Sequence, residues 1–338
     1  MKENGKQLSI IIPVYNMEKF LPKCIKSLEN QKFDDSVEII FIDDGSFDSS
    51  PQILDQAVMS NNNMNVFHQT NAGVANARNY GLQVAKGKYI AWLDPDDYIT
   101  NDWWKVISPL LKQNIDMIYF DMIIKRGNME YPRYFQNKSY MLNHDELCRE
   151  LARGNRMQSH LWSKIILRPY YLRTKTKRGY VFDPKLSYCE DFEVLHYICW
   201  PVKKCMYLHK PIYVYRQRDS SIVNNRNNKL QNFLLGIKLY KKRYDFYKYS
   251  TLNINKTGIL LAECRFILEY SIYSTVEEKD KYHKIYKKYR HDFFINGWKL
   301  LNDKHVLYRE KIIIFLILFH LEKICFKLKN IFKYLTKG

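Results

Sequence analysis

The first 100 residues of the chain repeat one pattern, in which a short apolar run ends in polar residues and is followed by an amphipathic stretch. Apolar runs separated by helical stretches predict alternating strands and helices, as in a doubly wound, mostly parallel α/β sheet. Such sheets bind ligands at the carboxyl ends of their strands. The expected strands are Leu8–Val14, Val37–Ile42, Asn65–Gln69 and Lys88–Leu93, with helices at Glu18–Asn30, Pro51–Ser60 and Val74–Lys86. We therefore expect a site just beyond Val14, Ile42 and Leu93.

The rest of the chain predicts two further regions. A strand at Ile115–Ile123 is expected to extend the sheet, and an irregular segment up to residue 225 is expected to fold against it. Residues 226–338 turn helical and rich in Lys and Tyr. The predicted domains are therefore 1–225, divided near residue 125, and 226–338, in a chain long enough for more than one core.

Charge is distributed unevenly along the chain. Residues 1–125 carry 12 Lys and Arg against 16 Asp and Glu, whereas the remainder carries 42 against 19. A basic rear section favours an anionic partner, such as nucleic acid, anionic lipid headgroups or a phosphate-bearing substrate. A hydrophobic content of 46% excludes a disordered chain.

Cysteine usage and the N-terminus indicate the compartment. The 7 cysteines form no CxxC pair, which favours reduced thiols in a cytosol. The polar leader Met1–Gln7 has no signal-peptide apolar core, and no run reaches the roughly 20 apolar residues that span a bilayer. The expectation is a cytoplasmic protein.

Acidic residues cluster where two predicted strands end. Asp94-Pro95-Asp96-Asp97 offers oxygen ligands that suit a hard cation such as Mg²⁺ or Mn²⁺ beside a diphosphate. The alternative is that Asp97 or Asn101 caps a helix starting near Trp103.

The segment after the second strand is also acidic. Asp44 could accept a hydrogen bond from a nucleobase imide, whereas Ser46 or Asp48 could cap the next helix. Arg78, on the third predicted helix, could grip a phosphate with both arms of its guanidinium, or could form a surface ion pair.

These segments together resemble glycosyltransferase family 2, whose members have the Rossmann-like GT-A fold. The resemblance rests on four motifs in order: Ile11-Ile-Pro-Val-Tyr-Asn16, Ile42-Asp-Asp-Gly-Ser46, Asn71-Ala-Gly-Val-Ala-Asn-Ala-Arg-Asn79 and Leu93-Asp-Pro-Asp-Asp97. It covers about the first 100 residues closely and extends more loosely to about residue 222. It implies a nucleotide-sugar-binding part in 1–125 and an acceptor side in 126–225.

The resemblance also implies residue roles on the donor side. The loop from Pro13 to Tyr15, with Asp44, would hold the uracil of a UDP-sugar. The motif from Asn71 to Arg78 would support the diphosphate. Asp94 and Asp96 would form the D-x-D metal site for Mn²⁺ or Mg²⁺, with Asp96 as the direct ligand and Asp94 also reaching ribose or sugar. The residue between the two acids is usually small, and here it is proline.

On the acceptor side the resemblance implies a catalytic carboxylate. Cys189-Glu190-Asp191-Phe192 is similar to the Glu-Asp motif of the family, which would make Asp191 the base of an inverting transfer and Glu190 its neighbour or an acceptor contact. The neighbouring carboxylate could raise the pKa of that base by repulsion. The alternative is an exposed acidic helix start. By the same resemblance, Arg218 is a phosphate contact, and Trp162 and Lys164 lie on the acceptor side.

The leading hypothesis is therefore an inverting transferase that moves a hexosyl or N-acetylhexosaminyl group from a UDP-sugar to a saccharide or lipid-linked acceptor in surface-glycan synthesis. The alternative is a catalytically silent nucleotide-sugar-binding or scaffold protein of a glycan assembly complex. A dinucleotide-dependent oxidoreductase is disfavoured, because the first turn is Pro13-Val-Tyr-Asn16 rather than a Gly-rich phosphate loop.

The C-terminal segment predicts an amphipathic helix. Apolar residues alternate at four- and three-residue steps, and lysines lie mostly off that face. Such a helix could lie in a membrane interface at the inner face of the cell membrane, pack on helices at Phe233–Tyr249 and Gly258–Tyr273, or join a second copy in a homodimer. Nucleic-acid binding ranks last because no known nucleic-acid motif is present. The apolar residues are Ile317, Leu321, Ile324, Leu328, Ile331 and Leu335, and the lysines are Lys323, Lys327, Lys329, Lys333 and Lys337.

Overall fold

The computed structural model describes residues 5–153, 160–187, 189–217, 229–252, 256–303, 306, 308–321 and 324. The chain divides into two compact units. The first consists of Met1–Leu151 with Arg156–Asp219, and the second of Ala152–Asn155 with Ser220–Gly338. The domain boundary predicted between residues 225 and 226 lies in a segment outside the described residues.

Strands and helices alternate from β1 to β4, as the sequence pattern predicts, and their order is less regular in the rest of the first unit. The strands are β1 (Leu8–Val14), β2 (Val37–Asp43), β3 (Met64–His68), β4 (Tyr89–Trp92), β5 (Tyr98–Ile99), β6 (Met117–Arg126), β7 (Met129–Arg133), β8 (Tyr140–Leu142), β9 (Lys164–Leu167) and β10 (Cys205–Arg216). The helices are α1 (Leu21–Glu29), α2 (Ser50–Ser60), α3 (Val74–Val84), α4 (Trp103–Leu111), α5 (His144–Arg153), α6 (Arg168–Arg178) and α7 (Glu190–Cys199).

Within the described residues, all these strands belong to one mixed sheet. Its order is β3-β2-β1-β4-β9-β6-β10-β5, with β7 on β6 and β8 on β10. The pairs β1–β2, β1–β4, β2–β3 and β6–β10 are parallel. The predicted mostly parallel sheet is confirmed; the antiparallel strands are β9, which lies between β4 and β6, and β5, β7 and β8, which pair with β10 or β6. The strand predicted at Ile115–Ile123 therefore extends the sheet through β9 rather than directly.

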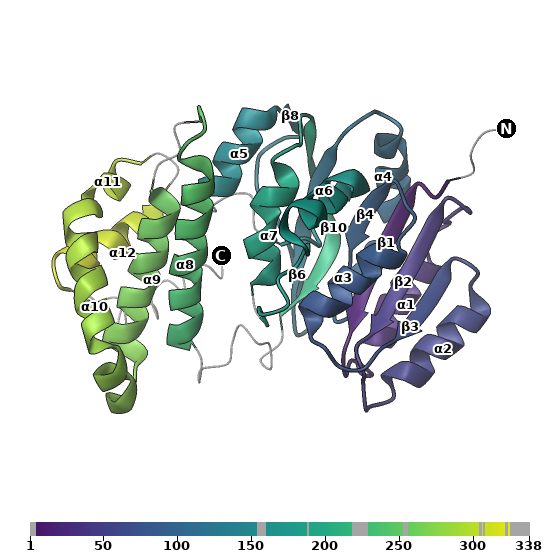
Figure 1. Ribbon diagram of the computed structural model, residues 1–338, viewed down its shortest axis with the longest axis horizontal. Helices are drawn as coiled ribbons and strands as arrows, with labels where there is room; N and C mark the ends of the chain where they lie inside the picture. Colours follow the sequence, from purple (N-terminus) through teal and green to yellow (C-terminus); the bar gives the residue numbers. More distant parts are fainter. Residues whose placement is uncertain are drawn as a thin grey trace. The chain divides into compact units, whose positions relative to one another are not determined.

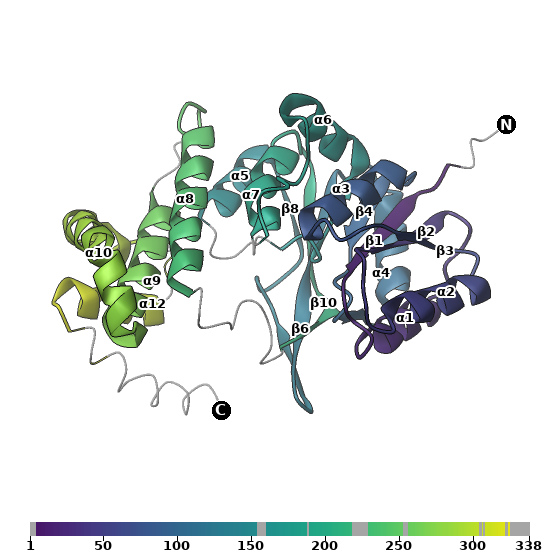
Figure 2. The same cartoon turned by 60° about the horizontal axis from the view of Figure 1, so that its bottom comes forward.

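Two apolar cores lie on the two faces of this sheet, because successive strand residues point to opposite sides. Ile10 and Ile12 pack with residues of α1, α2 and α4. Ile11, between them, packs in the other core with residues of α3, α5, α6 and α7. Figure 2 shows α3 and α6 on one side of the strands and α1, α2 and α4 on the other. Strand β1 is buried along its whole length, as expected for a central strand covered on both faces.

Helix α3 packs closely on the strands that end at the predicted site (Figure 1). Gly81 permits this contact, because a Cβ there would lie 2.4 Å from Cγ2 of Ile11. The helix begins at Val74, directly after the 69–73 loop that follows β3. Its first turns therefore lie near the carboxyl ends of β1 and β2.

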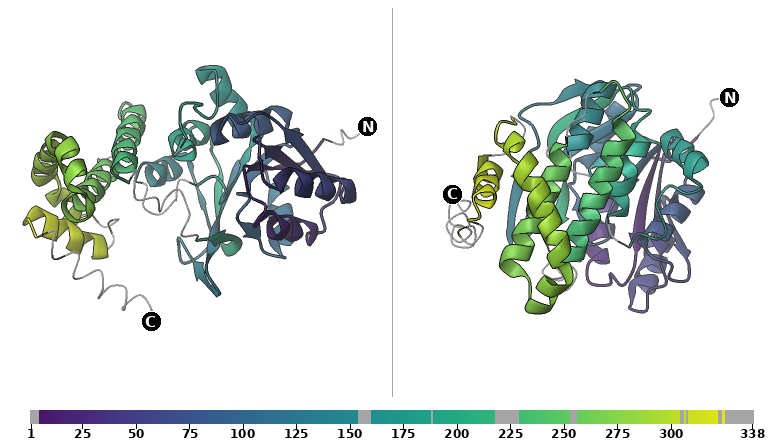
Figure 3. Two further views of the ribbon diagram at one scale, coloured as in Figure 1. Left: turned by 90° about the horizontal axis from the view of Figure 1, so that it is seen from below. Right: turned by 60° about the vertical axis from the view of Figure 1, so that its left-hand side comes forward.

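The second unit is helical in the residues described. Its helices are α8 (Lys229–Tyr247), α9 (Thr257–Tyr273), α10 (Val276–Asn296), α11 (Trp298–Leu301) and α12 (Tyr308–Leu318). Figure 3 shows its long helices side by side. One core joins Ile267 of α9, Phe293 of α10 and Ile317 of α12. No described helix is long and apolar enough to cross a membrane.

The predicted C-terminal face is only partly described, and the described part differs from the prediction. Ile317 is buried in the core, and α12 ends at Leu318. His320 then has a φ of 60°, which interrupts a continuous helix. Leu321 and Ile324 are exposed. Leu328, Ile331, Leu335 and the predicted lysines lie outside the described residues.

Candidate active site

The loops after β1 and β2 are joined by hydrogen bonds centred on Asn16. Its backbone N–H donates to Oγ of Ser46 at 2.9 Å, and its Oδ1 accepts from the backbone N–H of Phe47 at 3.0 Å. Asn16 has a φ of 52°, a conformation that asparagine tolerates better than most residues. Tyr15 is 43% exposed and meets the ring of Phe47 edge to face at 6.1 Å. Pro13 is buried within β1, so Tyr15 is the residue of this pair displayed at the sheet edge.

Asp44 connects the end of β2 to the start of α3. Its Oδ1 accepts from Nε2 of Gln69 at 2.6 Å and from the N–H of Ala72 at 2.8 Å, and its Oδ2 accepts from the N–H of Gly73 at 2.9 Å. Gly45, with a φ of 69°, allows this approach, because a Cβ there would lie 2.7 Å from the backbone N of Asn71. The carboxylate thus fixes the loop in which the exposed Asn71 lies.

Two residues considered as helix caps behave differently. Ser46 accepts from Asn16 and does not cap α2. Asp48 accepts from the N–H of Ser50, the first residue of α2, at 2.9 Å and from the N–H of Glu18 at 3.0 Å. Asp48 therefore bonds to the start of α2, as the capping interpretation expected. Asp44 instead makes its hydrogen bonds to the loop before α3.

A histidine at the end of β3 adds a charge beside this loop. Nδ1 of His68 lies 2.8 Å from Oδ2 of Asp43, and its Nε2 lies 3.2 Å from Oδ1 of Asp55. The hydrogen bond from Asp43 raises the pKa of His68, and Asp55 adds to the effect. Protonated His68 therefore stabilises the two acids that flank it.

Arg78 joins acidic residues from distant parts of the sequence. Its Nη1 forms an ion pair with Oε1 of Glu190, and its Nη2 lies 3.3 Å from Oδ1 of Asp94. The side chain is buried, with the rings of Trp92 and Phe182 each 5.8 Å from its guanidinium carbon. The surface ion pair considered for Arg78 is therefore wrong. The guanidinium links α3 to the end of β4 and to the start of α7.

Three acidic side chains around Arg78 have raised pKa values. Burial raises the pKa of Asp94 to about 7, although Arg78 opposes the shift, and Asp96 and Asp191 add to it by repulsion. Burial also raises the pKa values of Glu190 and Asp191, again against the effect of Arg78. For Asp191 the first cause is therefore burial rather than the neighbouring carboxylate expected from the sequence. Asp96, Asp191 and Glu190 all lie close enough to Asp94 to repel its carboxylate.

Asp97 has a structural role in this cluster. It is fully buried, and accepts from the hydroxyl of Tyr213 at 2.8 Å and from the N–H of Arg216 at 2.8 Å. The same tyrosine oxygen accepts from the N–H of Asp94 at 3.2 Å. Asp97 is thus anchored to β10.

The capping alternative for Asp97 and Asn101 is not supported. Helix α4 starts at Trp103 after Asp102, without a side-chain cap hydrogen bond. The side chain of Asn101 instead accepts from Asn30 at 3.4 Å. The acidic segment 94–97 therefore does not serve to start α4.

The two acids that the D-x-D pattern selects fit a divalent cation. In the described part of the chain, no group of three or more His, Cys, Asp or Glu residues has metal-ligand geometry. Mg²⁺-type sites, however, commonly use one or two carboxylates and complete their shell with substrate phosphates and water. Burial is the first cause of the raised pKa of Asp94, and repulsion by Asp96, Asp191 and Glu190, which a cation would offset, adds to it. Asp96, half-buried on the same loop, supplies the second carboxylate.

Asp191 lies in the first turn of α7. Its Oδ1 accepts from the N–H of Phe192 at 2.7 Å, and its Oδ2 lies 3.9 Å from Nδ1 of His160. Cys189, directly before the helix, has a φ of 61°, which is uncommon for a residue with a side chain. Glu190 is buried and Asp191 is half-buried, so the exposed helix start considered as an alternative is wrong.

An aromatic stack supports this side of the site. The ring of Trp162 lies between His160 at 4.9 Å and Tyr213 at 4.4 Å, with nearly parallel planes. Lys164 is fully buried and donates to the carbonyl oxygen of His160 at 2.6 Å. Trp162 and Lys164 therefore hold His160 in place beside Asp191.

Sequence reasoning missed two residues at the site, His160 and Tyr213. His160 belongs to the same segment as Trp162 and Lys164, which the sequence placed on the acceptor side. The sequence does not show, however, that His160 lies beside Asp191. Tyr213 gives no local signal, because a tyrosine in a strand usually indicates packing. Arg218 lies outside the described residues.

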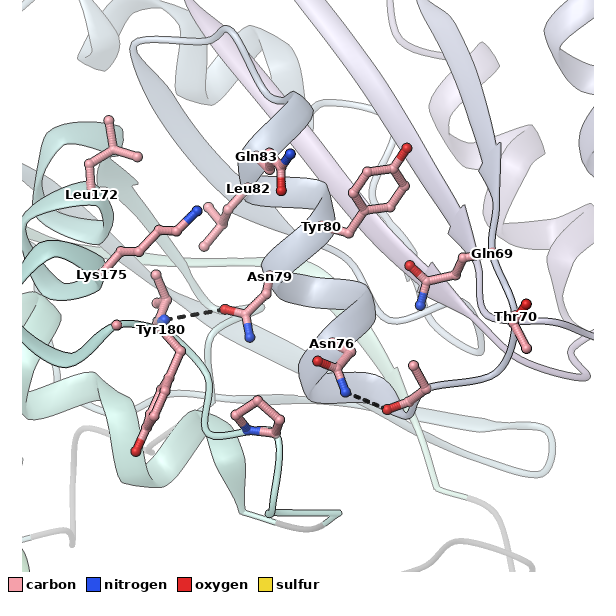
Figure 4. Close-up of a pocket in the computed structure, with 14 residues that line it drawn as sticks. Gln69, Thr70, Asn76, Asn79, Tyr80, Leu82, Gln83, Leu172, Lys175 and Tyr180 are labelled. Carbon is pink, nitrogen blue, oxygen red and sulfur yellow. Dashed lines mark hydrogen bonds between the residues drawn. The ribbon is translucent and has the colours of Figure 1, made fainter.

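A pocket of about 480 Å³ lies between α3, α6 and the loop before α3 (Figure 4). Gln69 and Ala72, which bind Asp44, contribute to its lining, as do Asn79, Lys175 and Tyr180. The amide of Asn79 is used for structure, because its Oδ1 accepts from the N–H of Val181 and its Nδ2 donates to the carbonyl of Phe182. None of the clustered acids lines this pocket. The place where these acids meet is therefore a better candidate for the active site than the pocket.

Comparisons with known proteins agree with this geometry. The model of the family described as "Glycosyl transferase family 2" matches residues 9–171. "Glycosyltransferase GlyG" of Streptococcus pneumoniae is 30% identical over 227 residues, which cover 64% of this chain and 72% of that protein. "Minor teichoic acid biosynthesis protein GgaB" of Bacillus subtilis is 26% identical over 223 residues, or 64% of this chain and 24% of that protein.

Solved structures extend the comparison to the whole fold. The crystal structure of S. aureus TarS 1-349 in complex with UDP-GlcNAc is similar with a TM-score of 0.63, 18% sequence identity, and coverage of 94% of this chain and 88% of that one. The predicted GT-A type of fold with a C-terminal helical region is thereby confirmed.

Proposed function

Because the chain belongs to glycosyl transferase family 2 and is a glycosyltransferase, we propose that it moves a hexosyl or N-acetylhexosaminyl group from a UDP-sugar, with inversion. The observation that carries this proposal is the convergence of Arg78, Asp94, Glu190 and Asp191 from three elements at the carboxyl end of the sheet. Transfer is assigned to residues 1–225, with the donor side in 1–125.

The base of the donor is proposed to bind at the ends of β1 and β2. The exposed ring of Tyr15 is available to the base. Oδ2 of Asp44 accepts one hydrogen bond from the described residues, and a carboxylate oxygen can accept two, so it can also accept a hydrogen bond from the uracil imide N–H. The TarS structure that shares this fold contains UDP-GlcNAc, which supports a UDP-sugar as the donor.

The diphosphate belongs beside the acids and Arg78. Asp96, with Asp94, would hold Mn²⁺ or Mg²⁺, and the bound cation would supply charge that stabilises the departing UDP. Arg78 keeps Asp94 and Glu190 in place through its two ion pairs and adds positive charge next to the diphosphate. Asn71 and Arg218 are proposed as further donor contacts.

Asp191 is proposed as the catalytic base. The acceptor hydroxyl gives its proton to the carboxylate as its oxygen forms a bond to the anomeric carbon, and the bond from that carbon to UDP breaks on the opposite side. Burial raises the pKa of Asp191 toward the range in which a carboxylate accepts a proton efficiently. His160, whose carbonyl oxygen accepts from Lys164, lies with Nδ1 3.9 Å from Oδ2 of this carboxylate, while Glu190 is fixed by Arg78.

The acceptor is proposed to be a saccharide or a lipid-linked glycan in surface-polysaccharide synthesis. A relative named for minor teichoic acid biosynthesis supports this class of pathway. The excess of Lys and Arg after residue 125 supports a cytoplasmic protein that docks on the inner face of the cell membrane. Residues 226–338 are proposed as the docking or dimerisation region.

The direct test is turnover. The protein with Mn²⁺ is incubated with a panel of UDP-sugars and membrane extract, while release of UDP and the anomeric configuration of the product are followed. We expect one UDP-sugar to be consumed and its anomeric configuration to be inverted. Binding of UDP-sugars without turnover for any acceptor would favour the silent scaffold instead, and retention of configuration would exclude Asp191 as the base.

A further inference from the structure

Large apolar side chains gather on the exposed surface of the second unit, where α10, α11 and α12 end. We call this set the aromatic patch, and its members are between 43% and 58% exposed. The ring of Phe319 meets Trp298 edge to face at 5.6 Å and lies 4.5 Å from Phe315. The aromatic patch consists of Phe294, Ile295, Trp298, Phe315 and Phe319.

The aromatic patch continues a row of basic residues on α10. Lys287, Lys288 and His291 are exposed and precede Phe294, Ile295 and Trp298 by seven residues each. Seven residues make about two helical turns, so each basic residue lies on the same helical face as one apolar residue. Gly297 between α10 and α11 has helical dihedral angles, which keeps Trp298 in line with α10. We call Lys284, Lys287, Lys288 and His291 the basic stripe.

A contiguous exposed apolar patch on a folded protein usually marks an interaction surface. The side chains that stabilise this unit are different ones, such as Ile317 and Phe293, which are fully buried. The exposed rings next to them therefore contribute little to the fold.

We propose that the aromatic patch and the basic stripe dock the protein on an anionic lipid surface. Aromatic rings, above all tryptophan, favour the boundary between headgroups and acyl chains, and lysines are attracted to anionic headgroups. The net charge of this unit favours an anionic membrane over a second copy of the chain as the partner. Residues 220–338 carry 24 Lys and Arg against 10 Asp and Glu, so two such units would repel each other, whereas an anionic bilayer attracts them.

This docking surface rests on the proposed membrane location. It differs from the C-terminal face that the sequence pattern predicted as the membrane contact. The face predicted from Ile317 onward is turned into the core at its first residue. Phe315 and Phe319, two residues to either side of Ile317, are exposed, and Leu321 and Ile324 further along are exposed as well. The membrane contact is thus assigned to the opposite side of the chain near α12.

Vesicle binding tests the proposal without any sugar chemistry. The full chain is sedimented with phosphatidylcholine vesicles that contain or lack phosphatidylserine. The double variant W298A/F319A removes two rings of the aromatic patch, and K287E/K288E reverses the basic stripe. Y249A is the matched control, because Tyr249 is an exposed tyrosine of the same unit outside both sets. Circular dichroism monitors folding, and turnover of UDP-sugar in solution is measured in parallel.

We expect binding to the anionic vesicles only, weakened at least about tenfold in W298A/F319A and about fivefold or more in K287E/K288E, with Y249A unchanged. Equal binding by wild type and both variants would overturn the proposal, as would a lack of binding to anionic vesicles. A concentration-dependent dimer that W298A/F319A abolishes would assign the surface to a second copy. Absence of UDP-sugar turnover in a wild-type protein that binds the anionic vesicles, with the variants weakened as expected, would contradict the proposed function and leave this inference intact.

Discussion

Each unit of the molecule contains a carboxylic acid whose pKa burial raises to about 7, and the two acids differ in their surroundings. Asp94, in the first unit, meets its near neighbour Asp96 and also Arg78 and Asp191, which come from other parts of the sequence. Glu263, in the second, lies on α9 with Nζ of Lys241 at 3.8 Å, and Lys241 opposes the shift. One acid belongs to a cluster at the carboxyl end of a sheet, and the other to a helical core.

This difference shows that a raised pKa does not by itself identify a catalytic site. Burial is the first cause at both positions. Charged groups from other segments surround both acids, Lys241, Lys256 and Asp292 in the case of Glu263, but those around Asp94 lie at the sheet edge where ligands usually bind. The following predictions test whether catalysis depends on the charged groups that meet around Asp94, or whether burial of an acid is enough.

The largest expected effect is on catalysis. Asp191→Asn should lower the rate of sugar transfer by about 10²- to 10⁴-fold, because the acceptor proton loses its base. Binding of UDP should remain, since Asp191 lies on the acceptor side. Kinetic assays and calorimetry measure the two quantities. Glu263→Gln is the matched control and should leave transfer unchanged; an equal loss in both variants would mean that burial alone matters.

The next effect concerns stability. Arg78→Met should lower the free energy of unfolding by about 3–5 kcal/mol at pH 8, because it leaves buried carboxylates without their cation. The loss should shrink near pH 5, where Asp94, Glu190 and Asp191 take up protons more readily. Urea denaturation at both pH values measures this. Lys241→Met, which removes a more exposed cation, should cost less, and an equal cost would remove the distinction between the units.

The raised pKa of Asp94 predicts a pH dependence of ligand binding. Its carboxyl holds a proton below about pH 7, so Mn²⁺-dependent UDP binding should weaken about tenfold for each pH unit below that value. The stability contribution has the opposite sign: it is complete below about pH 4 and is lost progressively as the pH rises to about 7. Calorimetric titrations from pH 5.5 to 8 test the first statement.

Asp94→Asn should abolish this pH dependence of UDP binding, because no proton has to leave. Glu263→Gln should leave the dependence of UDP binding in place while changing only that of stability. A pH profile that Glu263→Gln alters as strongly as Asp94→Asn does would contradict the assignment.

The smallest effect is expected at His68. Its pKa is raised by Asp43, so the stability that its charge provides is present below about pH 6.5 and is lost as the pH rises through the raised value. His68→Gln should therefore cost under about 1 kcal/mol at pH 5.5, because the ring is partly exposed, and nearly nothing at pH 9. Thermal melting at the two pH values checks this, and an equal cost at both would show that charge is not involved.

The sequence predicted the first half of the fold well for a physical reason. Strands such as Leu8–Val14 are buried on both faces and read as unbroken apolar runs, and Gly45 and Gly81 stand where backbones must approach closely. The antiparallel β9 was not foreseen, because its direction depends on pairing with β4 and β6.

The sequence could not predict which side chains contact one another at the site. Motif residues such as Asp44 and Arg78 could be named from the sequence, but their hydrogen bonds and ion pairs join residues more than 15 positions apart. At Ile317 the alternative of packing on the helix Gly258–Tyr273 holds, and the sequence left it open because an amphipathic pattern does not say whether its apolar side meets a core or a membrane.

The central claim, that the acids at the sheet edge bind a nucleotide diphosphate together with a cation, is tested most directly by calorimetric titration of UDP. The titrations are run at pH 7.5 with and without Mn²⁺ on the wild type, Asp96→Asn and Glu263→Gln. The account predicts that Mn²⁺ strengthens UDP binding at least about tenfold in the wild type and in Glu263→Gln, and has no effect in Asp96→Asn. The same Mn²⁺ enhancement in all three proteins would contradict it.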